Sequence, residues 1–191
     1  MPLCADANPK VAMLKPCLIA ASLLTALPAA AYESKTRTDY IIPHWDNLLR
    51  NLQLPPLPVG LEPGSSRFRF TVSAAWQPPM FVWIETFDDG RPARVARMAA
   101  LDPSGRGTYA PGTATSRHVS DAELAPFRAA LTAAKLCGAP LEGQIGNDGF
   151  TYNFEFANAT RYCAATRWAP QDGDPFSALG QAVLNLAQPP K

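Results

Sequence analysis

Two cysteines, Cys137 and Cys163, limit how the elements of this chain can be arranged. They are the pair that remains once a leader-like N-terminal segment, which holds the other two cysteines, is set aside. An even number of cysteines in an exported chain predicts a disulfide. Closing a loop of about 27 residues is expected to stabilise the fold by roughly 3.5 kcal/mol. A catalytic thiol or a metal ligand would need a partner, and neither histidine lies near these cysteines in the sequence.

The N-terminal segment has the three parts of a secretory signal peptide. Lys10 and Lys15 form a basic region, an apolar run follows over 17–27, and alanines 29–31 supply the small residues for cleavage. The run of about 11 residues is too short to cross a bilayer as a helix, which takes roughly 20. An N-terminal anchor or a buried helix is the alternative. We predict a signal peptide over 1–31, a mature protein in the periplasm or outside the cell, and no membrane span after cleavage.

The charge of the chain argues against two classes of partner. The whole chain has 17 basic and 16 acidic residues, and 15 of each remain without the leader. A surface that binds nucleic acid or an anionic membrane normally has a basic excess, so we expect neither as a partner. A mature chain of roughly 160 residues suits one domain with one core.

The segment 32–66 is predicted to be an extended, proline-rich arm with a short helix. The helix is expected over 46–52, with its apolar residues on one side. Four prolines between 54 and 64 then rule out regular structure and favour an extended backbone. This stretch could be a spacer or could lie across the domain, and its leucines favour the second arrangement.

An α+β domain is predicted over 67–188, with a mainly antiparallel sheet of about five strands in the order βββ-α-ββ-α and one disulfide. The first strand alternates apolar and polar residues, which is typical of a half-buried strand. The turn signal Asp-Asp-Gly separates the second strand from the third. The strands are expected over 67–74, 80–87 and 94–101, with a break at 77–79 and a loop over 102–116.

Two helices are predicted from their capping residues. Ser120 and Glu123 form a capping box before an apolar stripe of helical spacing. Gly138 suits a left-handed residue past the end of that helix, which places Cys137 in its last turn. Asp174 is the predicted N-cap of the second helix, and the proline after it suits the first helical position.

The stretch 150–156 alternates aromatic and polar residues and predicts a strand with one aromatic face, followed by a return strand over 161–168. A three-residue loop would pair Glu155 with Arg161 and match like residues on each face. Cys163 then points away from the aromatic face, so either the first helix covers the opposite face or the chain after it wraps around the sheet edge. On the face opposite the aromatic residues, this register places Glu155, Arg161, Cys163 and Arg167.

The residues Glu155, Arg161, Arg167 and Trp168 form a candidate binding group. On one sheet face they could bind an anion or an arginine of a partner. Two arginines beside a carboxylate favour its ionised form, so Glu155 suits a salt bridge better than general-acid chemistry. The alternative is a surface ion-pair ladder beside a buried tryptophan, with each pair contributing at most about 1 kcal/mol.

The segments 148–155 and 162–170 contain two short motifs. They read Asp-Gly, two residues, Tyr, two residues, Glu, and later Tyr, four residues, Arg-Trp-Ala-Pro. This pair resembles one in a family of small uncharacterised bacterial α+β proteins, where Trp stands at Tyr152, Ser at Ala169 and often His at Cys163. The resemblance covers the chain from Phe68 onward and implies a fold, because the family carries no activity that can be transferred. The cysteine at position 163, where the family often has histidine, suggests together with Cys137 an exported branch of that family that is stabilised by a disulfide.

The sequence has no recognisable set of catalytic residues. Neither His44 nor His118 lies beside a nucleophile motif, and the spacing of metal ligands is missing. We therefore expect a non-catalytic protein-binding protein, of inhibitor or immunity type or an accessory subunit, without a cofactor and with another exported protein as its partner. The alternative is a small cell-envelope hydrolase that uses Glu155 or Asp148 as acid or base.

Overall fold

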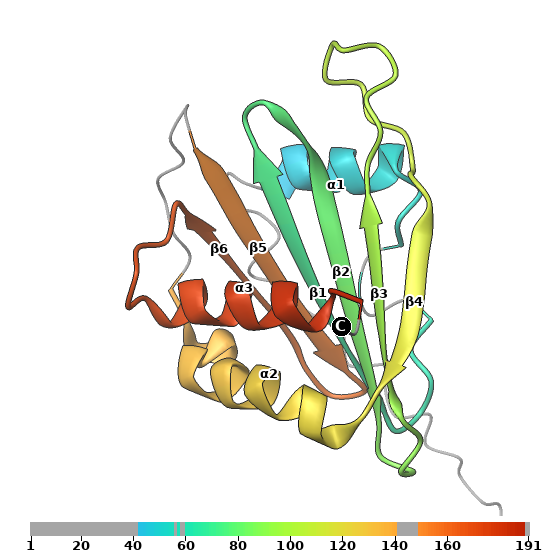
Figure 1. The fold of residues 1–191 in the computed structure, drawn as a ribbon, viewed down its shortest axis with the longest axis vertical. Helices are drawn as coiled ribbons and strands as arrows, with labels where there is room; N and C mark the ends of the chain where they lie inside the picture. Colours follow the sequence, from blue (N-terminus) through green and yellow to red (C-terminus); the bar gives the residue numbers. More distant parts are fainter. Residues whose placement is uncertain (1–41, 56, 58–59, 141–148, 190–191) are drawn as a thin grey trace, which may run out of the picture. The chain divides into compact units, whose positions relative to one another are not determined.

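The computed structural model describes residues 42–55, 57, 60–140 and 149–189, which are arranged as Figure 1 shows. The predicted signal peptide over 1–31 lies outside the described residues, as does the start of the arm. Within the described ranges, none of the helices combines the length and the apolar character needed to cross a membrane.

The predicted α+β class with an antiparallel sheet is confirmed, with one strand more than expected. The six strands run in the order β4-β3-β2-β1-β5-β6, and each neighbouring pair is antiparallel. The strands are β1 (Ser65–Ala74), β2 (Gln77–Phe87), β3 (Ala93–Ala99), β4 (Ala114–Val119), β5 (Phe150–Asn158) and β6 (Tyr162–Trp168). The helices are α1 (Ile42–Asn51), α2 (Asp121–Ala134) and α3 (Pro175–Leu186), with a short 3₁₀ turn, η1 (Leu136–Gly138), after α2.

The additional strand is β4, which begins inside the region predicted as a loop. It pairs with β3 from Ala93↔Val119 to Met98↔Ala114. Within β4 only Val119 is buried, because β4 is an edge strand with little apolar cover. Its sequence therefore lacks the alternation that identifies a half-buried strand.

The break predicted at 77–79 is also wrong. The chain turns over Ala75 and Trp76, and Ala74 pairs with Gln77, so β2 begins directly after a two-residue turn. Pro79 donates no hydrogen bond, but its carbonyl accepts one from the amide of Ala100 at 2.8 Å. Proline is tolerated near the beginning of a strand or at a bulge, where its missing N–H removes no ladder hydrogen bond, and the β1–β2 register is irregular here, between Val72 and Ala74.

The helices α2 and α3 lie side by side on one face of the sheet (Figure 1). The rings of Phe68 and Phe127 meet edge to face with centroids 5.0 Å apart, and those of Phe154 and Phe176 lie 5.3 Å apart. The predicted capping box and the Asp174 N-cap are both present. In α3, a Cβ on Gly180 would lie 2.5 Å from the ring of Tyr152, so this close contact requires glycine.

The opposite face of the sheet is covered by α1 and the segment that follows it. Leu48, Leu49 and Leu52 pack with Phe81 and other residues of β2 and β3 in a second apolar cluster. Leu57, in the proline-rich segment, is buried as well. This cover explains why β1 is buried on both faces rather than half-buried as predicted, and its polar residues Arg69 and Thr71 are 1% and 0% exposed.

The β5–β6 hairpin has a different register from the predicted one. Phe156 pairs with Cys163 and Ala157 with Tyr162, whereas the predicted loop paired Glu155 with Arg161. A register shift by an odd number of residues moves every side chain to the other face. Cys163 therefore lies on the aromatic face, which α2 covers, and this settles how it meets the end of that helix.

The predicted disulfide between Cys137 and Cys163 is present, with Cα atoms 4.9 Å apart. Cys137 lies in η1 rather than in the last turn of α2. The left-handed residue is Lys135, with φ 48° and ψ 44°, and not Gly138. The chain leaves the helix earlier than predicted, and the extra 3₁₀ turn carries Cys137 to β6.

Replacing Lys135 by glycine should raise the free energy of unfolding by about 0.5–1 kcal/mol, because glycine adopts the left-handed conformation without strain. Urea denaturation measures this change. Lys135→Ala is the matched control, since it removes the side chain but keeps the strained Cβ. Equal stability of the two variants would contradict the role of backbone strain.

Replacing Cys137 and Cys163 together by alanine should lower the free energy of unfolding by about 3.5 kcal/mol through the freer unfolded chain. Urea denaturation of the oxidised protein gives the reference value. A loss below about 1 kcal/mol would mean that the disulfide does not constrain the unfolded chain as expected.

Candidate binding surface

A buried ion pair between Arg69 of β1 and Glu155 of β5 lies on the arm-side face of the sheet, meaning the face that α1 and the proline-rich segment cover. These two residues are directly opposite each other in the register. Arg69 Nε donates to Glu155 Oε2 at 2.5 Å, and Tyr162 Oη donates to Glu155 Oε1 at 2.8 Å. Arg69 Nη1 donates to the carbonyl of Pro55 at 2.9 Å. Arg69 Nη2 also lies 2.5 Å from Glu155 Oε2, but it is not directed at this oxygen.

This environment favours a structural role for Glu155. Its side chain is 8% exposed, and both carboxylate oxygens already accept hydrogen bonds. A general acid or base must reach the substrate proton that it transfers. The ion pair instead connects β1, β5, β6 and the arm. Asp148, the other acid or base considered from the sequence, lies outside the described residues.

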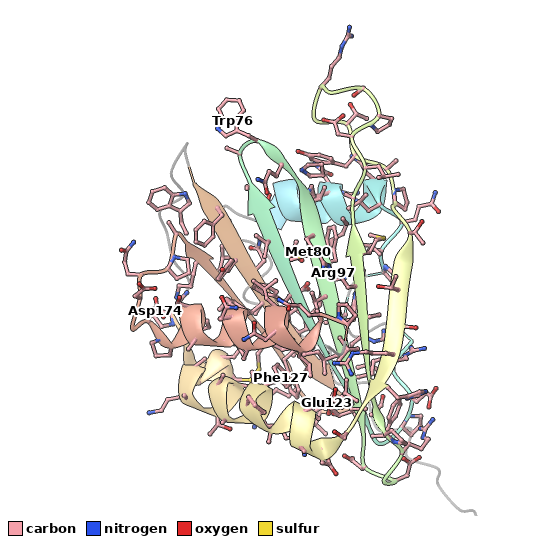
Figure 2. The ribbon with its side chains drawn as sticks, viewed as in Figure 1. Trp76, Met80, Arg97, Glu123, Phe127 and Asp174 are labelled. Carbon is pink, nitrogen blue, oxygen red and sulfur yellow. A yellow bond between two sulfur atoms is a disulfide. The ribbon has the colours of Figure 1, made fainter. Side chains whose placement is uncertain are left out.

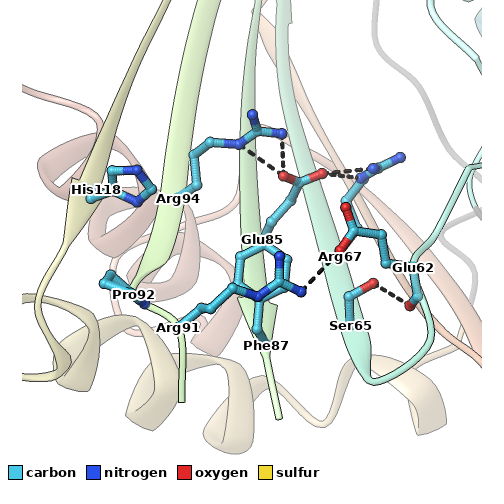
Figure 3. Close-up of a pocket in the computed structure, with 9 residues that line it drawn as sticks. All are labelled: Glu62, Ser65, Arg67, Glu85, Phe87, Arg91, Pro92, Arg94 and His118. Carbon is cyan, nitrogen blue, oxygen red and sulfur yellow. Dashed lines mark hydrogen bonds and ion pairs between the residues drawn. The ribbon is translucent and has the colours of Figure 1, made fainter. Parts of the chain in front are cut away.

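A second ion-pair cluster on the arm-side face borders a hollow of about 290 Å³ (Figure 3). Glu85 accepts hydrogen bonds from Arg67 and Arg94 on the two neighbouring strands. Burial alone would raise the pKa of Glu85, but the hydrogen bonds from Arg94 and Arg67 outweigh it and lower that pKa. Arg91, at the rim, pairs with Glu62 at 2.9 Å. Every arginine of this hollow therefore already has a carboxylate partner.

The four residues predicted as a binding group do not form one site, because the hairpin register differs. Glu155 lies on the arm-side face, while Arg167 lies on the helix side, with its guanidinium 4.1 Å from the ring centroid of Phe176. Arg161 is exposed in the β5–β6 turn. Trp168 lies at the far end of β6, opposite Thr151.

An exposed aromatic surface lies at the end of the sheet where β1 turns into β2. Trp76, in this two-residue turn, is 88% exposed and points away from the domain (Figure 2). Phe150, on the neighbouring strand β5, is 37% exposed. Trp168 follows on β6, where it is half-buried and pairs with Thr151, so it lies on the opposite face of the sheet from Phe150. We call Trp76, Phe150 and Trp168 the hairpin-tip surface.

The backbone beneath the hairpin-tip surface is held in place. The amide of Ala75 donates to the carbonyl of Gly149 at 3.2 Å, which ties the β1–β2 turn to the beginning of β5. Gly149 has φ 129°, and a Cβ there would lie 3.3 Å from Trp168 Cζ2. The amide of Ala169 donates to the carbonyl of Phe150 at 2.8 Å. The aromatic side chains therefore project from a hydrogen-bonded scaffold.

Sequence reasoning missed Trp76 because the prolines after it were interpreted as a break. The two turn residues, Ala75 and Trp76, also lack the Asn, Asp or Gly that identifies a two-residue β-hairpin turn in a sequence. The burial of Arg69 was missed because the alternation of apolar and polar residues in β1 predicts only one buried face. It does not reveal that another segment covers the polar face.

No family model matches this chain, and no curated protein matches it. The resemblance to the bacterial motif family therefore stays a prediction. In the part of the chain that the structure describes, no three His, Cys, Asp or Glu residues are grouped so that they could hold a metal ion.

Arg69→Met should lower the free energy of unfolding by about 3–5 kcal/mol, because it leaves Glu155 buried without its charge partner. Adding Glu155→Leu to this variant should recover part of the loss, since both buried charges are then removed. Urea denaturation of both variants measures the two effects.

Arg91→Met is the matched control for this pair, because the Arg91 side chain is 49% exposed and its ion pairs are solvated. Its loss should stay below about 1 kcal/mol. If Arg69→Met costs no more than Arg91→Met, the buried pair does not have the structural role described above.

Proposed function

We propose that this chain is a non-catalytic protein-binding module that is exported to an oxidising compartment and binds its partner through the hairpin-tip surface. The observation that carries the proposal is the 88% exposure of Trp76 on a tied hairpin turn. Tryptophan is one of the residue types enriched among the side chains that dominate binding energies at protein interfaces. Phe150 is a second exposed aromatic residue at this end of the sheet, and exposed apolar patches mark contact sites.

The expected energy of this contact is large enough for specific binding. An aromatic side chain buries about 150–250 Å², which corresponds to roughly 4–6 kcal/mol at 25 cal/mol per Å². Part of this is lost in association itself. A rigid two-residue turn keeps the ordering cost low, because its backbone is already hydrogen-bonded before binding.

The partner is expected to offer an apolar recess that accepts an indole ring. The turn residues Ala75 and Trp76, together with Gln77 and Pro78, bring no charge to the tip. An inhibitor or immunity-type protein would bind in this way at a recess of an enzyme. Export is supported by the disulfide, since such bonds persist mainly in oxidising compartments, and by the leader-like segment 1–31.

A pull-down from a periplasmic extract with the mature, oxidised protein should return a stoichiometric partner. Trp76→Ala should weaken its binding by about 30- to 1,000-fold, equivalent to 2–4 kcal/mol, as measured by calorimetry with the purified partner. The urea midpoint of this variant should stay unchanged because the indole is exposed.

Leu101→Ala is the matched control, since Leu101 is also an exposed apolar residue, at 55%, but lies outside the hairpin-tip surface. It should bind the partner as the wild type does. The proposal fails if no stoichiometric partner is recovered, or if Trp76→Ala binds with unchanged affinity.

A further inference from the structure

A hollow of about 320 Å³ lies where the end of α2 meets the β5–β6 hairpin. Its volume is at the low end of the range of small-molecule pockets, about 300–1,000 Å³. It is remote in sequence from the turn that carries Trp76. We call it the disulfide hollow, and its lining includes Leu131, Lys135, Leu136, Cys137, Phe156 and Arg161.

One part of the disulfide hollow is apolar. Leu131 and Phe156 are half-buried and pack against the main apolar core, to which the buried Leu136 belongs. These side chains therefore keep part of their surface exposed toward the hollow while the core holds them in place. The disulfide fixes this arrangement, because it ties η1 to β6 directly beside it.

Two cations, Lys135 and Arg161, line the same hollow, and both residues are exposed. The lining contains no acidic residue. Neither side chain forms a hydrogen bond or ion pair with any residue that the structure describes. This distinguishes the disulfide hollow from that of Figure 3, where each arginine faces a carboxylate. Two like charges beside an apolar surface favour an anion between them.

The end of α2 accounts for only one of these two cations. The negative end of the α2 dipole attracts a cation such as Lys135, but Arg161 belongs to the β5–β6 turn. Lys135 also has the left-handed conformation, in which glycine is the usual residue at a helix end. Strained residues of this kind are concentrated at functional sites.

We propose that the disulfide hollow binds a small organic anion with an apolar chain, of the alkyl carboxylate class. The alkyl chain packs on Leu131 and Phe156. The carboxylate accepts hydrogen bonds from the ammonium of Lys135 and the guanidinium of Arg161, which are the strong, charge-assisted kind. This site is separate from the hairpin-tip surface and does not depend on the proposed protein-binding function.

Titration of the oxidised protein with octanoate, followed by ¹H–¹⁵N NMR, tests the proposal. Saturable shifts are expected at the amides of residues 131–137, 156 and 161. Octanol has the same chain without the charge, and acetate has the charge without the chain. Each should bind about tenfold more weakly than octanoate, the factor expected when one of two recognition elements is lost. Octanol binding as tightly as octanoate, or no saturable octanoate binding, overturns the proposal.

Two variants assign the binding to the cations. Lys135→Gly and Arg161→Gln should each weaken octanoate binding by about tenfold, and Lys135→Gly should do so without lowering the urea midpoint. Arg97→Gln, which removes an exposed arginine of β3 outside the hollow, is the matched control and should bind octanoate normally. Wild-type affinity in both Lys135→Gly and Arg161→Gln, or an equal loss in Arg97→Gln, overturns the site.

Discussion

The arrangement of this domain depends on the ion pair between Arg69 and Glu155 at the centre of the sheet. A buried guanidinium is costly unless its charge is paired and hydrogen bonds hold it in place. Glu155 supplies the charge from β5, and the carbonyl of Pro55 accepts from Nη1. Tyr162 completes the group from β6. The proline-rich segment is therefore a structural part of the domain, because it covers a charged residue in the interior of the sheet.

The disulfide lies on the opposite face and depends on the register of the β5–β6 hairpin, as the hydrogen bond from Tyr162 to Glu155 also does. Glu155 can pair with Arg69 only if Phe154 and Phe156 face α2 and α3, and Cys163 faces the same way as its register partner Phe156. The covalent link from Cys137 then holds the end of α2 against β6. The observed hairpin register thus allows the Tyr162 hydrogen bond to Glu155 on one face and the disulfide on the other, whereas the predicted register would turn both Tyr162 and Cys163 to the wrong faces.

The surface of the domain has three kinds of site that differ in how their groups are satisfied. The arginines around Glu85 are neutralised by carboxylates. The charged groups of the hollow in Figure 3 are therefore paired with one another. The hairpin-tip surface has exposed aromatic rings on a fixed backbone, which suits contact with another protein. The disulfide hollow has cations without acidic partners beside apolar side chains, which suits a small anion. The proposed functions follow from the exposed Trp76 of the hairpin-tip surface and from the cations of the disulfide hollow.

Local patterns in the sequence determined the capping box at Ser120, the N-cap at Asp174, the apolar stripe of α3 and the α+β class, because caps and periodicity act over a few residues. The cysteine pair also followed from composition and the leader-like segment. The tertiary structure decided the rest. Edge strand β4, the burial of Arg69 and the exposure of Trp76 depend on which segments cover each face, and alternation within one strand does not carry that information. The hairpin register goes with contacts distant in sequence, the disulfide from Cys163 to η1 and the hydrogen bond from Tyr162 to the buried Glu155, and in this register the four predicted binding residues are separated in space.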